Sequence, residues 1–418
     1  MVNDWMNGRI YGLLGRTLKH SYSVPIHRAL GNEGYALYEL EPDALGVFLA
    51  REDIGGLNVT IPYKRDVMPF CDVLDETARA IGSVNTIVRR ADGLLAGYNT
   101  DAYGLGYMAS CAGISLSGKK VVILGSGGAS LTAQYVAKTA GAREIVVVSR
   151  GGADNYDTLK QHVDAQVLIN TTPVGMYPHA GELPADPALF PVCEGVLELI
   201  YNPRRTALSF RAAELGIPCS EGLSMLTAQA KAAEELFFGR AIPDGENERI
   251  LRLMRQSTQN IVLIGMPGSG KTTIGQALAR LTGRTAIDLD EQIVKADGRT
   301  IPEIFAQSGE AAFRAMEREQ AQTWGKESGL ILVSGGGIVK HEANYASLKQ
   351  NGRIYQIERE PSLLPREGRP LSQKADLNAM LRERAPLYAR FRDAHIANET
   401  TPEEAAAKIW QDFCDNVD

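Results

Sequence analysis

The stretch that most constrains the fold is Gly265–Thr273, with the sequence G-M-P-G-S-G-K-T-T. It matches the phosphate-binding loop pattern G-x-x-x-x-G-K-[ST] at every fixed position. The apolar run 261–264 before it predicts a buried parallel strand, and apolar residues at helical spacing follow as far as Leu281. Backbone N–H groups and a helix N-terminus then face the phosphate oxygens, and Lys271 adds a full positive charge. The pattern predicts a domain that binds ATP or GTP, with the Thr272 hydroxyl on a magnesium ion.

The position of this loop leaves room for other domains before it. A chain of 418 residues is long for one core, so two or three domains are expected. The net charge of -6 argues against a general nucleic-acid surface, and no apolar run reaches membrane-spanning length. The first ten residues lack a secretion pattern, and the five cysteines lie far apart without C-x-x-C spacing. We therefore expect a cytoplasmic enzyme that binds neither nucleic acid nor membrane, and leave open whether it is a monomer or a homodimer.

Two segments near the N-terminus place polar side chains at predicted element ends. Ser21 and Ser23 alternate before a helix predicted to open near Pro25, where hydroxyl groups either cap the helix or bind an anion. The predicted strand 54–60 leads into I-P-Y-K, predicted as the start of a helix. Lys64 then lies at the C-terminal end of a strand, where α/β sheets place their sites.

A hairpin is predicted next. Residues 83–88 and 94–101 flank the turn A-D-G and read as its two arms. Asp101 follows the second arm. Considered alone, it is more typical of the N-cap of a helix over 103–112 than of a catalytic group.

The middle of the chain predicts a dinucleotide fold. Strand 119–124, the turn G-S-G-G-A-S, a helix over about 131–139 and strand 144–149 form a βαβ unit with a variant of G-x-G-x-x-G/A. The second strand ends in Ser149-Arg150 instead of the acidic residue that would hold the ribose of NAD. An arginine here can bind the 2′-phosphate of NADP, so the pattern favours NADP. If Arg150 is only a solvated loop residue, NAD remains the alternative.

An amphipathic helix is predicted over 223–238. Met225 and Gln229 share one side of it, so Gln229 lies either on the surface or in a cleft. A connecting helix over 246–255 and a polar linker over 257–260 follow, which places the domain boundary near 241–259.

Residues 9–240 resemble the shikimate dehydrogenase family. The motifs occur in order as G-x-x-x-x-H-S-Y-S-x-P-I-H, N-V-T-I-P-Y-K, S-V-N-T-I, Y-N-T-D-A-Y-G, G-S-G-G-A, N-T-T-P-V-G-M, Y-N-P and G-L-S-M-L-x-x-Q-A. The resemblance implies NADPH-dependent reduction of 3-dehydroshikimate to shikimate, with Lys64 and Asp101 as the catalytic pair. The substrate-binding residues that it implies are Ser21, Ser23, Asn58, Thr60, Asn85 and Gln229. The cofactor-binding residues are Gly125, Gly127, Gly128, Ala129, Ser149, Arg150, Thr171, Tyr201, Gly222 and Met225.

The chain departs from this family at a few positions. Ser149-Arg150-Gly151 stands where the family often has Asn-Arg-Thr, which weakens the preference for NADP. Glu198 stands where an aspartate is usual before the Y-N-P motif, and the loop 151–161 is hard to align. None of these departures touches Lys64 or Asp101. The catalytic role of this pair also has a chemical reason that does not depend on the resemblance. An ammonium held by a carboxylate can stabilise and protonate the alkoxide that forms when hydride reaches a ketone.

The last 160 residues add acidic and basic groups to the phosphate loop. Asp288 and Asp290 lie in a predicted strand 285–290 and would point to one side of it, which suits metal contact and orientation of a hydroxyl nucleophile; helix capping is the alternative. Arg314 lies on a predicted helix, and G-G-G at 335–337 allows close approach of a ligand. Each arginine alone is typical of a surface charge, but several in one small domain favour an anionic ligand.

Residues 259–398 look like the shikimate kinase family. The motifs are D-L-D, F-x-x-x-G-E-x-x-F-R, G-G-G, R-P-L and R-A-P-L-Y. The resemblance implies phosphoryl transfer from ATP to the 3-hydroxyl of shikimate. It implies that Arg314, Gly336 and Arg384 bind the substrate and that Asp290 orients or deprotonates the 3-hydroxyl. It implies that Thr272 and Asp288 hold magnesium, directly or through water. It implies that Lys271 and a lid arginine, Arg369 or alternatively Arg366, neutralise the phosphates. The residues that it implies for nucleotide binding in the loop are Gly268, Ser269, Gly270, Lys271, Thr272 and Thr273.

The expected architecture is therefore α/β throughout. A shikimate dehydrogenase-like substrate domain over 1–112, completed by a helix at about 222–240, is joined to a Rossmann NADP domain over 113–221. A connecting segment over 241–258 leads to a P-loop domain over 259–418 with a parallel sheet like that of nucleoside-monophosphate kinases. The predicted function is a fused enzyme for consecutive shikimate-pathway steps. The alternatives are a quinate/shikimate dehydrogenase half that uses NAD, and a chain with one catalytic half whose other half is a binding module.

Overall fold

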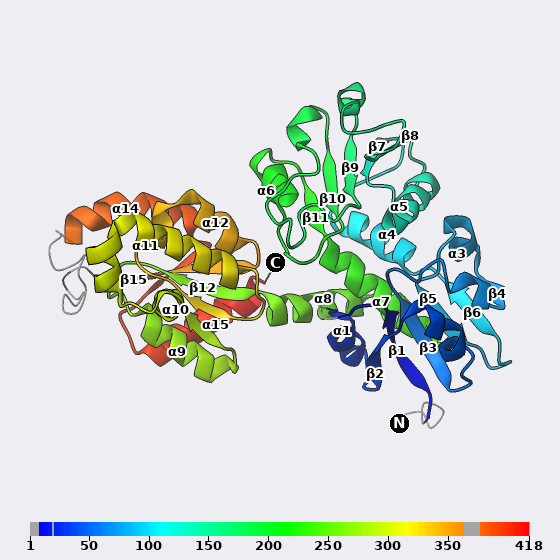
Figure 1. The fold of residues 1–418 in the computed structure, drawn as a ribbon, viewed down its shortest axis with the longest axis horizontal. Helices are drawn as coiled ribbons and strands as arrows, with labels where there is room; N and C mark the ends of the chain where they lie inside the picture. The colour runs from blue at the N-terminus through cyan, green and yellow to red at the C-terminus, as the bar shows by residue number, and fades with distance from the viewer. Residues whose placement is uncertain (1–7, 19–20, 361, 363–376, 418) are drawn as a thin grey trace. The chain divides into compact units, whose positions relative to one another are not determined.

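The computed structural model describes residues 8–18, 21–360, 362 and 377–417. The chain divides into two compact units, Met1–Leu251 and Arg252–Asp418. Both are α/β structures in which helices pack on sheets made largely of parallel strands (Figure 1). This agrees with the predicted fold class.

The first unit begins with a mixed six-stranded sheet in the order β2-β1-β3-β5-β6-β4. Strands β1, β2 and β3 are parallel, whereas β5 and β6 form the antiparallel hairpin predicted from the sequence. The strands are β1 (Ile10–Gly15), β2 (Tyr35–Glu39), β3 (Ile54–Val59), β4 (Val73–Leu74), β5 (Thr86–Arg89) and β6 (Leu95–Tyr98). The helices are α1 (Ser23–Ala29), η2 (Pro42–Ala44), α2 (Leu45–Leu49), η3 (Met68–Phe70), α3 (Glu76–Ile81) and α4 (Asp101–Cys111).

The second sheet of this unit is fully parallel, in the order β11-β10-β9-β7-β8. Its strands are β7 (Lys120–Leu124), β8 (Glu144–Val148), β9 (Val167–Asn170), β10 (Gly195–Glu198) and β11 (Cys219–Glu221). The accompanying helices are α5 (Gly128–Thr139), η4 (Leu159–His162), η5 (Pro187–Leu189) and α6 (Ala207–Glu214). The predicted βαβ unit is confirmed as β7, α5 and β8, and its parallel register places the glycine turn at the carboxyl end of β7.

Helix α7 (Gly222–Phe238) follows the second sheet but packs on the first. The ring of Phe237 lies 5.7 Å from that of Tyr11 on β1. The chain then continues into α8 (Gly245–Thr258), which runs to within two residues of strand β12. The predicted polar linker over 257–260 is therefore mostly helix and strand.

The second unit is built on a five-stranded parallel sheet in the order β13-β14-β12-β15-β16. The strands are β12 (Asn260–Ile264), β13 (Ala286–Asp288), β14 (Ile331–Val333), β15 (Gly352–Glu358) and β16 (Ala394–Ala397). The helices are α9 (Lys271–Thr282), α10 (Leu289–Asp297), α11 (Ile301–Gly325), η6 (Ile338–Lys340), α12 (Glu342–Lys349), α14 (Leu377–Phe391) and α15 (Pro402–Asp415).

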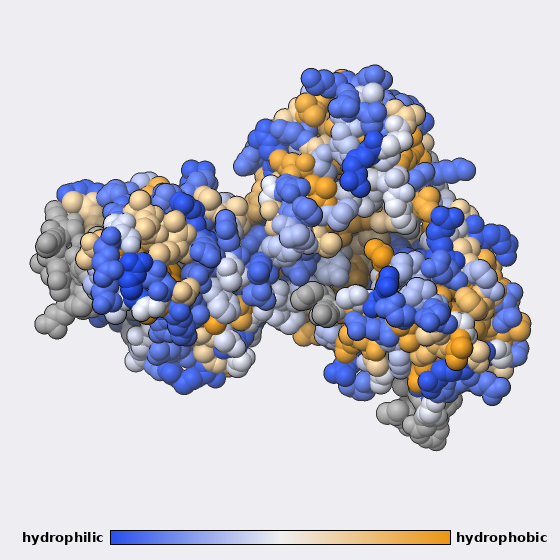
Figure 2. Space-filling model, viewed as in Figure 1, coloured by the Kyte–Doolittle hydropathy of each residue, from blue (hydrophilic) through white to orange (hydrophobic). Residues whose placement is uncertain are grey.

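Alternation along β12 explains why this sheet is buried on both faces. Ile261 and Leu263 pack into a cluster with α9 and α15, whereas Val262 and Ile264 pack into a second cluster with α11, α12 and α14. Because successive side chains of a strand point to opposite faces, an unbroken apolar run is what a sheet covered on both sides requires. In the view of Figure 2, hydrophilic residues cover most of the surface.

One local prediction in the first unit is wrong. The segment after β3 does not start a helix but continues as turns, with Tyr63 N–H donating to the carbonyl of Thr60 and a cis peptide bond between Ile61 and Pro62. The expected placement of Lys64 just beyond a strand is nevertheless observed. In the described part of the chain, no helix is long and apolar enough to cross a membrane.

Candidate active sites

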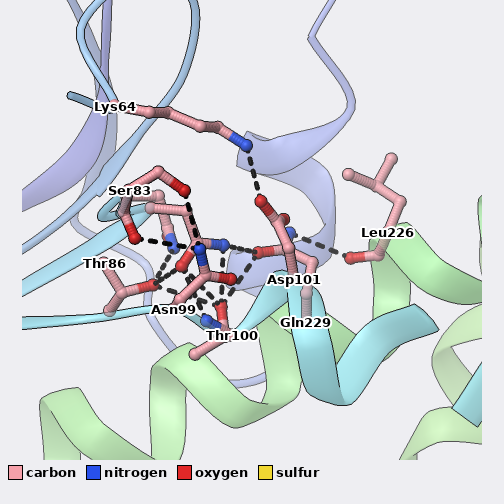
Figure 3. Close-up of polar contacts among 10 residues, drawn as sticks. Lys64, Ser83, Thr86, Asn99, Thr100, Asp101, Leu226 and Gln229 are labelled. Atoms are coloured by element: carbon pink, nitrogen blue, oxygen red, sulfur yellow. Dashed lines mark hydrogen bonds and ion pairs between the residues drawn. The ribbon is translucent and has the colours of Figure 1, made fainter. Parts of the chain in front are cut away.

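Lys64 and Asp101 form an ion pair in the first unit. The Lys64 Nζ atom donates a hydrogen bond of 2.6 Å to Asp101 Oδ2 (Figure 3). Asp101 is the first residue of α4, and the N-cap residue is Thr100, so the predicted alternative that Asp101 caps the helix is wrong. Its side chain is 14% exposed and that of Lys64 is 26% exposed, so the pair is only partly shielded and remains accessible to a ligand.

Beside this pair lies a buried cluster of amide and hydroxyl side chains. Asn85 Oδ1 accepts a 2.7 Å hydrogen bond from the backbone N–H of Thr100, and its Nδ2 atom lies 3.4 Å from Gln229 Oε1. Gln229 in turn donates to the carbonyl of Leu226 (Figure 3). Asn58 donates to Thr86 Oγ1. The structure thus brings together three predicted amides from β3, the start of the hairpin and α7. Of the two alternatives for Gln229, the surface position is wrong.

The remaining predicted substrate residues lie at the ends of other elements of the first unit. Ser21 Oγ accepts a hydrogen bond of 3.1 Å from the backbone N–H of Ser23, the first residue of α1. Thr60 follows β3, and its backbone N–H donates to the carbonyl of Leu14. Ser23 is buried, with 7% of its surface exposed.

The glycine turn after β7 has room for a ligand. Gly125 has a φ of 106°, and an added Cβ would lie 2.7 Å from Thr171 Oγ1, so only glycine fits. Gly127 and Gly128, at the start of α5, would meet no atom within 4 Å. This open space faces a helix N-terminus, where backbone N–H groups suit an anionic group such as a pyrophosphate.

Most of the residues predicted to hold the rest of the cofactor lie just after the ends of neighbouring strands. Ser149 and Arg150 follow β8, and Arg150 is exposed and makes no ion pair within the described residues. Thr171 donates through its hydroxyl to the carbonyl of Leu124, while Tyr201 packs its ring 5.3 Å from that of Tyr22. Burial raises the pKa of Tyr201. Gly222 and Met225 begin α7, and a Cβ on Gly222 would collide with the carbonyl of Leu199.

Glu198, one of the departures from the family pattern, is fully buried between two loops. Its carboxylate accepts hydrogen bonds from Asn170 Nδ2, Thr206 Oγ1 and the backbone N–H of Ile200. Burial raises the pKa of Glu198 to about 7, although these donors oppose the rise. The longer side chain therefore still joins the loops after β9 and β10.

The phosphate loop of the second unit opens into a cavity of about 580 Å³. Gly268 and Gly270 have φ values of 85° and 97°, which favour glycine. Lys271 is the first residue of α9, and its Nζ atom donates to the carbonyls of Gly265 and Met266, both at 2.9 Å. The Ser269 carbonyl accepts a hydrogen bond from Asn398, which ties the loop to the end of β16. The cavity is lined by Gly268, Gly270, Lys271, Thr272, Thr273, Asp288, Asp290, Arg314, Gly336 and Arg384, among others.

The two aspartates lie in this cavity, but not on one strand as predicted. Strand β13 ends at Asp288, which is the N-cap of α10 and accepts a hydrogen bond from the backbone N–H of Asp290. An aspartate that caps a helix in this way ends the strand, so Asp290 lies in the first helical turn. The other oxygen of Asp288 is 3.0 Å from Thr272 Oγ1. Asp288 therefore both caps α10 and lies close to the phosphate loop.

Asp290 combines burial with an unused hydrogen-bonding atom. Its Oδ1 atom is buried and has no hydrogen-bond partner among the described residues. Burial, together with the neighbouring Asp288 carboxylate, raises the pKa of Asp290 to about 6, although Lys271 and Arg314 oppose the rise. A carboxylate with a pKa in this range and a free acceptor atom is suited to receive a proton from a hydroxyl group.

The arginines of the cavity are already oriented by protein groups. Arg314 donates to both oxygens of Glu317, at 3.0 and 2.9 Å, and to Glu310 at 3.0 Å. Arg384 donates to the carbonyl of Gly336 at 2.9 Å. Arg366 and Arg369, the alternative lid arginines, lie outside the described residues.

Comparison with known proteins identifies the first unit. Residues 13–87 match the family model for the shikimate dehydrogenase substrate binding domain. The shikimate dehydrogenase (NADP(+)) of Clostridium beijerinckii is 35% identical over 246 residues, covering 54% of this chain and 91% of that protein. This chain belongs to the shikimate dehydrogenase family.

Solved structures of this family agree. A chorismate mutase/shikimate 5-dehydrogenase fusion protein from Clostridium acetobutylicum is 35% identical with a TM-score of 0.56, and covers 59% of this chain and 97% of its own. Shikimate 5-dehydrogenase from Thermus thermophilus, in complex with NADP(H) and shikimate, is 29% identical with a TM-score of 0.53 and covers 59% and 99%. In the second unit, residues 267–414 match the shikimate kinase model. The chain thus carries a shikimate dehydrogenase unit and a shikimate kinase domain.

Sequence reasoning missed several side chains of these sites. Thr86 and Thr100 bridge the amides of the dehydrogenase cluster, and Glu317 fixes Arg314 in the kinase cavity. A signal for the threonines was present, since Thr86 follows Asn85 and Thr100 precedes Asp101 within quoted motifs. Glu317 follows Arg314 by three residues on a helix, a spacing that places both on one face.

Proposed function

We propose that the chain reduces 3-dehydroshikimate to shikimate with NADPH in its first unit and phosphorylates shikimate with ATP in its second. The observation that carries this proposal is that each unit matches its family and also brings together the side chains that the reaction requires. The first has the Lys64–Asp101 pair at 2.6 Å. The second has Lys271, Asp288 and Asp290 around one cavity. A unit that only bound a ligand would need neither a proton-transfer pair nor a buried base, which argues against the binding-module alternative.

In the dehydrogenase unit, Lys64 would act on the carbonyl oxygen of the substrate. NADPH supplies the hydride when bound. Negative charge then grows on the carbonyl oxygen, and the ammonium of Lys64 stabilises it and donates a proton. Asp101 holds the ammonium in place. Ser21 and Ser23 would bind the substrate carboxylate, and Asn58, Thr60, Asn85 and Gln229 its hydroxyl groups.

The residues present fit NADP. Gly127 and Gly128 leave open space at the N-terminus of α5 for the pyrophosphate. Arg150 lies exposed after β8, where a cation binds a 2′-phosphate. Ser149 takes the place of the acidic residue typical of NAD enzymes. Thr171, Tyr201, Gly222 and Met225 would complete the nicotinamide side of the cofactor site.

Replacing Arg150 with alanine tests the choice of cofactor. We expect the KM for NADP(H) to rise about tenfold, because a charge-assisted hydrogen bond to the phosphate is lost. The KM for NAD(H), which lacks this phosphate, should stay unchanged. Arg143→Ala is a matched control, because Arg143 is an exposed arginine just before the other end of β8. Equal changes with both cofactors would contradict the assignment of Arg150.

In the kinase domain, Asp290 would orient and deprotonate the 3-hydroxyl of shikimate. Arg314 and Arg384 would bind the substrate carboxylate beside Gly336, whose lack of a side chain allows close approach. Lys271 would move from the loop carbonyls to the phosphates, and the loop Gly268–Thr273 would hold them through backbone N–H groups. Arg369 or Arg366 remains a proposal for the second phosphate cation.

The residues present also fit magnesium. The Thr272 hydroxyl and an Asp288 oxygen lie 3.0 Å apart and offer the hard oxygen ligands that Mg²⁺ prefers. No group of three or more acidic, histidine or cysteine side chains in the described residues can hold a metal ion. Phosphate oxygens and water would therefore supply most ligands, as is usual for Mg²⁺ at nucleotide sites.

A single assay tests the whole proposal. The full chain, given 3-dehydroshikimate, NADPH and MgATP, should form shikimate 3-phosphate with one NADPH and one ATP consumed per molecule. Product that stops at shikimate would contradict the kinase assignment, and consumption of ATP only with added shikimate would contradict the dehydrogenase assignment. The two reactions are consecutive steps toward chorismate and the aromatic amino acids, and a cytoplasmic location remains a prediction.

A further inference from the structure

A buried tyrosine stands behind the substrate-site amides of the dehydrogenase unit. Tyr35, on β2, is 1% exposed, and its hydroxyl donates a hydrogen bond of 2.7 Å to Asn58 Oδ1. Its ring stacks on that of His27 at a centroid distance of 3.8 Å and an interplanar angle of 3°. His27 is itself paired with Glu234, which also accepts from Asn32, and neither His27 nor Glu234 is exposed. The tyrosine ring is therefore held in one position.

The Tyr35 hydroxyl has one possible direction of hydrogen bonding. Among the described residues, Asn58 is its only hydrogen-bond partner. Burial raises the pKa of Tyr35 well above its usual value, so the hydroxyl keeps its proton. If it accepted from the Asn58 amide, its own O–H would remain buried without a partner, which is costly. Tyr35 therefore donates, and the oxygen of the Asn58 amide must face it.

The orientation of the Asn58 amide limits the hydrogen bonds that its neighbours can make. With its oxygen toward Tyr35, Asn58 turns its Nδ2 atom to Thr86 Oγ1 at 3.2 Å. Thr86 then accepts from Asn58, and its single proton is within reach of two acceptors, Asn85 Oδ1 at 3.1 Å and Thr100 Oγ1 at 3.2 Å. Asn85 Oδ1 accepts from the backbone N–H of Thr100, which fixes which end of that amide is oxygen.

We propose that Tyr35 is a positioning residue of the dehydrogenase site, which fixes the Asn58 amide so that its nitrogen presents a second N–H to a substrate hydroxyl group. The inference rests on the proposed substrate-binding role of Asn58. Without the phenol hydroxyl, the Asn58 oxygen is buried without a donor and the amide no longer has one preferred orientation. An amide turned over would offer an oxygen where the substrate needs an N–H.

Tyr35→Phe tests this role because it keeps the ring and its stacking on His27. We expect the KM for shikimate, measured in the oxidation direction with NADP+, to rise about five- to tenfold, as for loss of one buried hydrogen-bond donor. The kcat value and the KM for NADP+ should stay near wild type. Tyr63→Phe is the matched control, since Tyr63 is equally buried and its hydroxyl also donates one hydrogen bond, but to the backbone carbonyl of Leu40.

A double-mutant cycle separates positioning from a general loss of stability. In an Asn58→Ala background, Tyr35→Phe should have no further effect on the KM for shikimate, because the amide it orients is gone. Full additivity of the two effects, or an unchanged KM in Tyr35→Phe, would overturn the proposal. If wild-type protein oxidises shikimate while Tyr35→Phe behaves as wild type, only this inference fails; if wild-type protein does not oxidise shikimate, the proposed function fails.

A second variant decides the matter if Tyr35→Phe does not fold. Thr86→Val breaks the same chain of hydrogen bonds on the other side of Asn58, and should raise the KM for shikimate in the same way. Thr86→Ser retains the hydroxyl and should restore a KM close to wild type. An equal KM for the valine and serine variants would overturn the proposal.

Discussion

Replacement of Lys64 with alanine should lower kcat for 3-dehydroshikimate reduction by about 10²–10⁴-fold, the range for loss of a general acid. The variant loses both the ammonium that stabilises the alkoxide and the proton that neutralises it. Kinase activity in the same preparation should not change, because Lys64 belongs to the other compact unit. The two rates are measured from NADPH absorbance and from ADP release.

Two further variants test whether the lower rate of Lys64→Ala comes from the loss of the proton donor. Lys64→Arg keeps a cation beside Asp101, but a guanidinium does not give up its proton, so the rate should stay low. Lys119→Ala removes another lysine–carboxylate pair, with Glu194 at 2.6 Å, and should leave the rate unchanged. Loss of both dehydrogenase and kinase activity in Lys64→Ala would show that the halves do not act independently.

The Asp290→Asn variant should lose kinase activity by about 10²–10⁴-fold, because an amide does not accept the proton of the 3-hydroxyl. It should not lower the thermal unfolding midpoint. Burial raises the pKa of Asp290, which means that the folded state disfavours the charged carboxylate, and the neutral amide avoids this penalty. Asp297→Asn, at the other end of α10, is the control and should retain activity.

The pH profile of the wild-type kinase supplies an independent check. A base works in its ionised form. The rate should therefore be maximal at pH values above about 6 and should fall as the pH decreases through about 6, the pKa of Asp290. An Asp290→Asn variant that keeps wild-type kcat would contradict the role of this residue. A wild-type profile that is flat through this range would contradict it as well.

The elements that carry the site were largely predictable because their signals are local. The burial of Ile261 and Val262 on opposite faces of the sheet follows from an apolar run before a glycine turn. The hairpin β5–β6 follows from two strand-like runs around A-D-G. In each case the residues that decide the conformation are neighbours in the chain, so the pattern already contains the cause.

The errors arose where two local signals compete. Asp288 can continue a strand or cap a helix, and its bond to the backbone N–H of Asp290 shows that capping prevails. The proline after Ile61 is typical of a first helical position, but the chain makes turns there. Asp101 is a standard capping residue by type, yet its carboxylate is bound by Lys64. For Asp101 a partner 37 residues away in the chain decides the outcome, and no pattern within a few residues contains it.

The sequence by itself determined the fold class and the two families, and it predicts which glycines, lysines and aspartates carry the chemistry, because backbone conformation and reactive groups are properties of short segments. Only the tertiary structure decided how those groups are oriented. Tyr35 lies 23 residues from Asn58, and Gln229 lies 144 residues from Asn85. The direction of a buried hydrogen bond depends on every donor and acceptor within reach, and packing of distant segments is what brings them there.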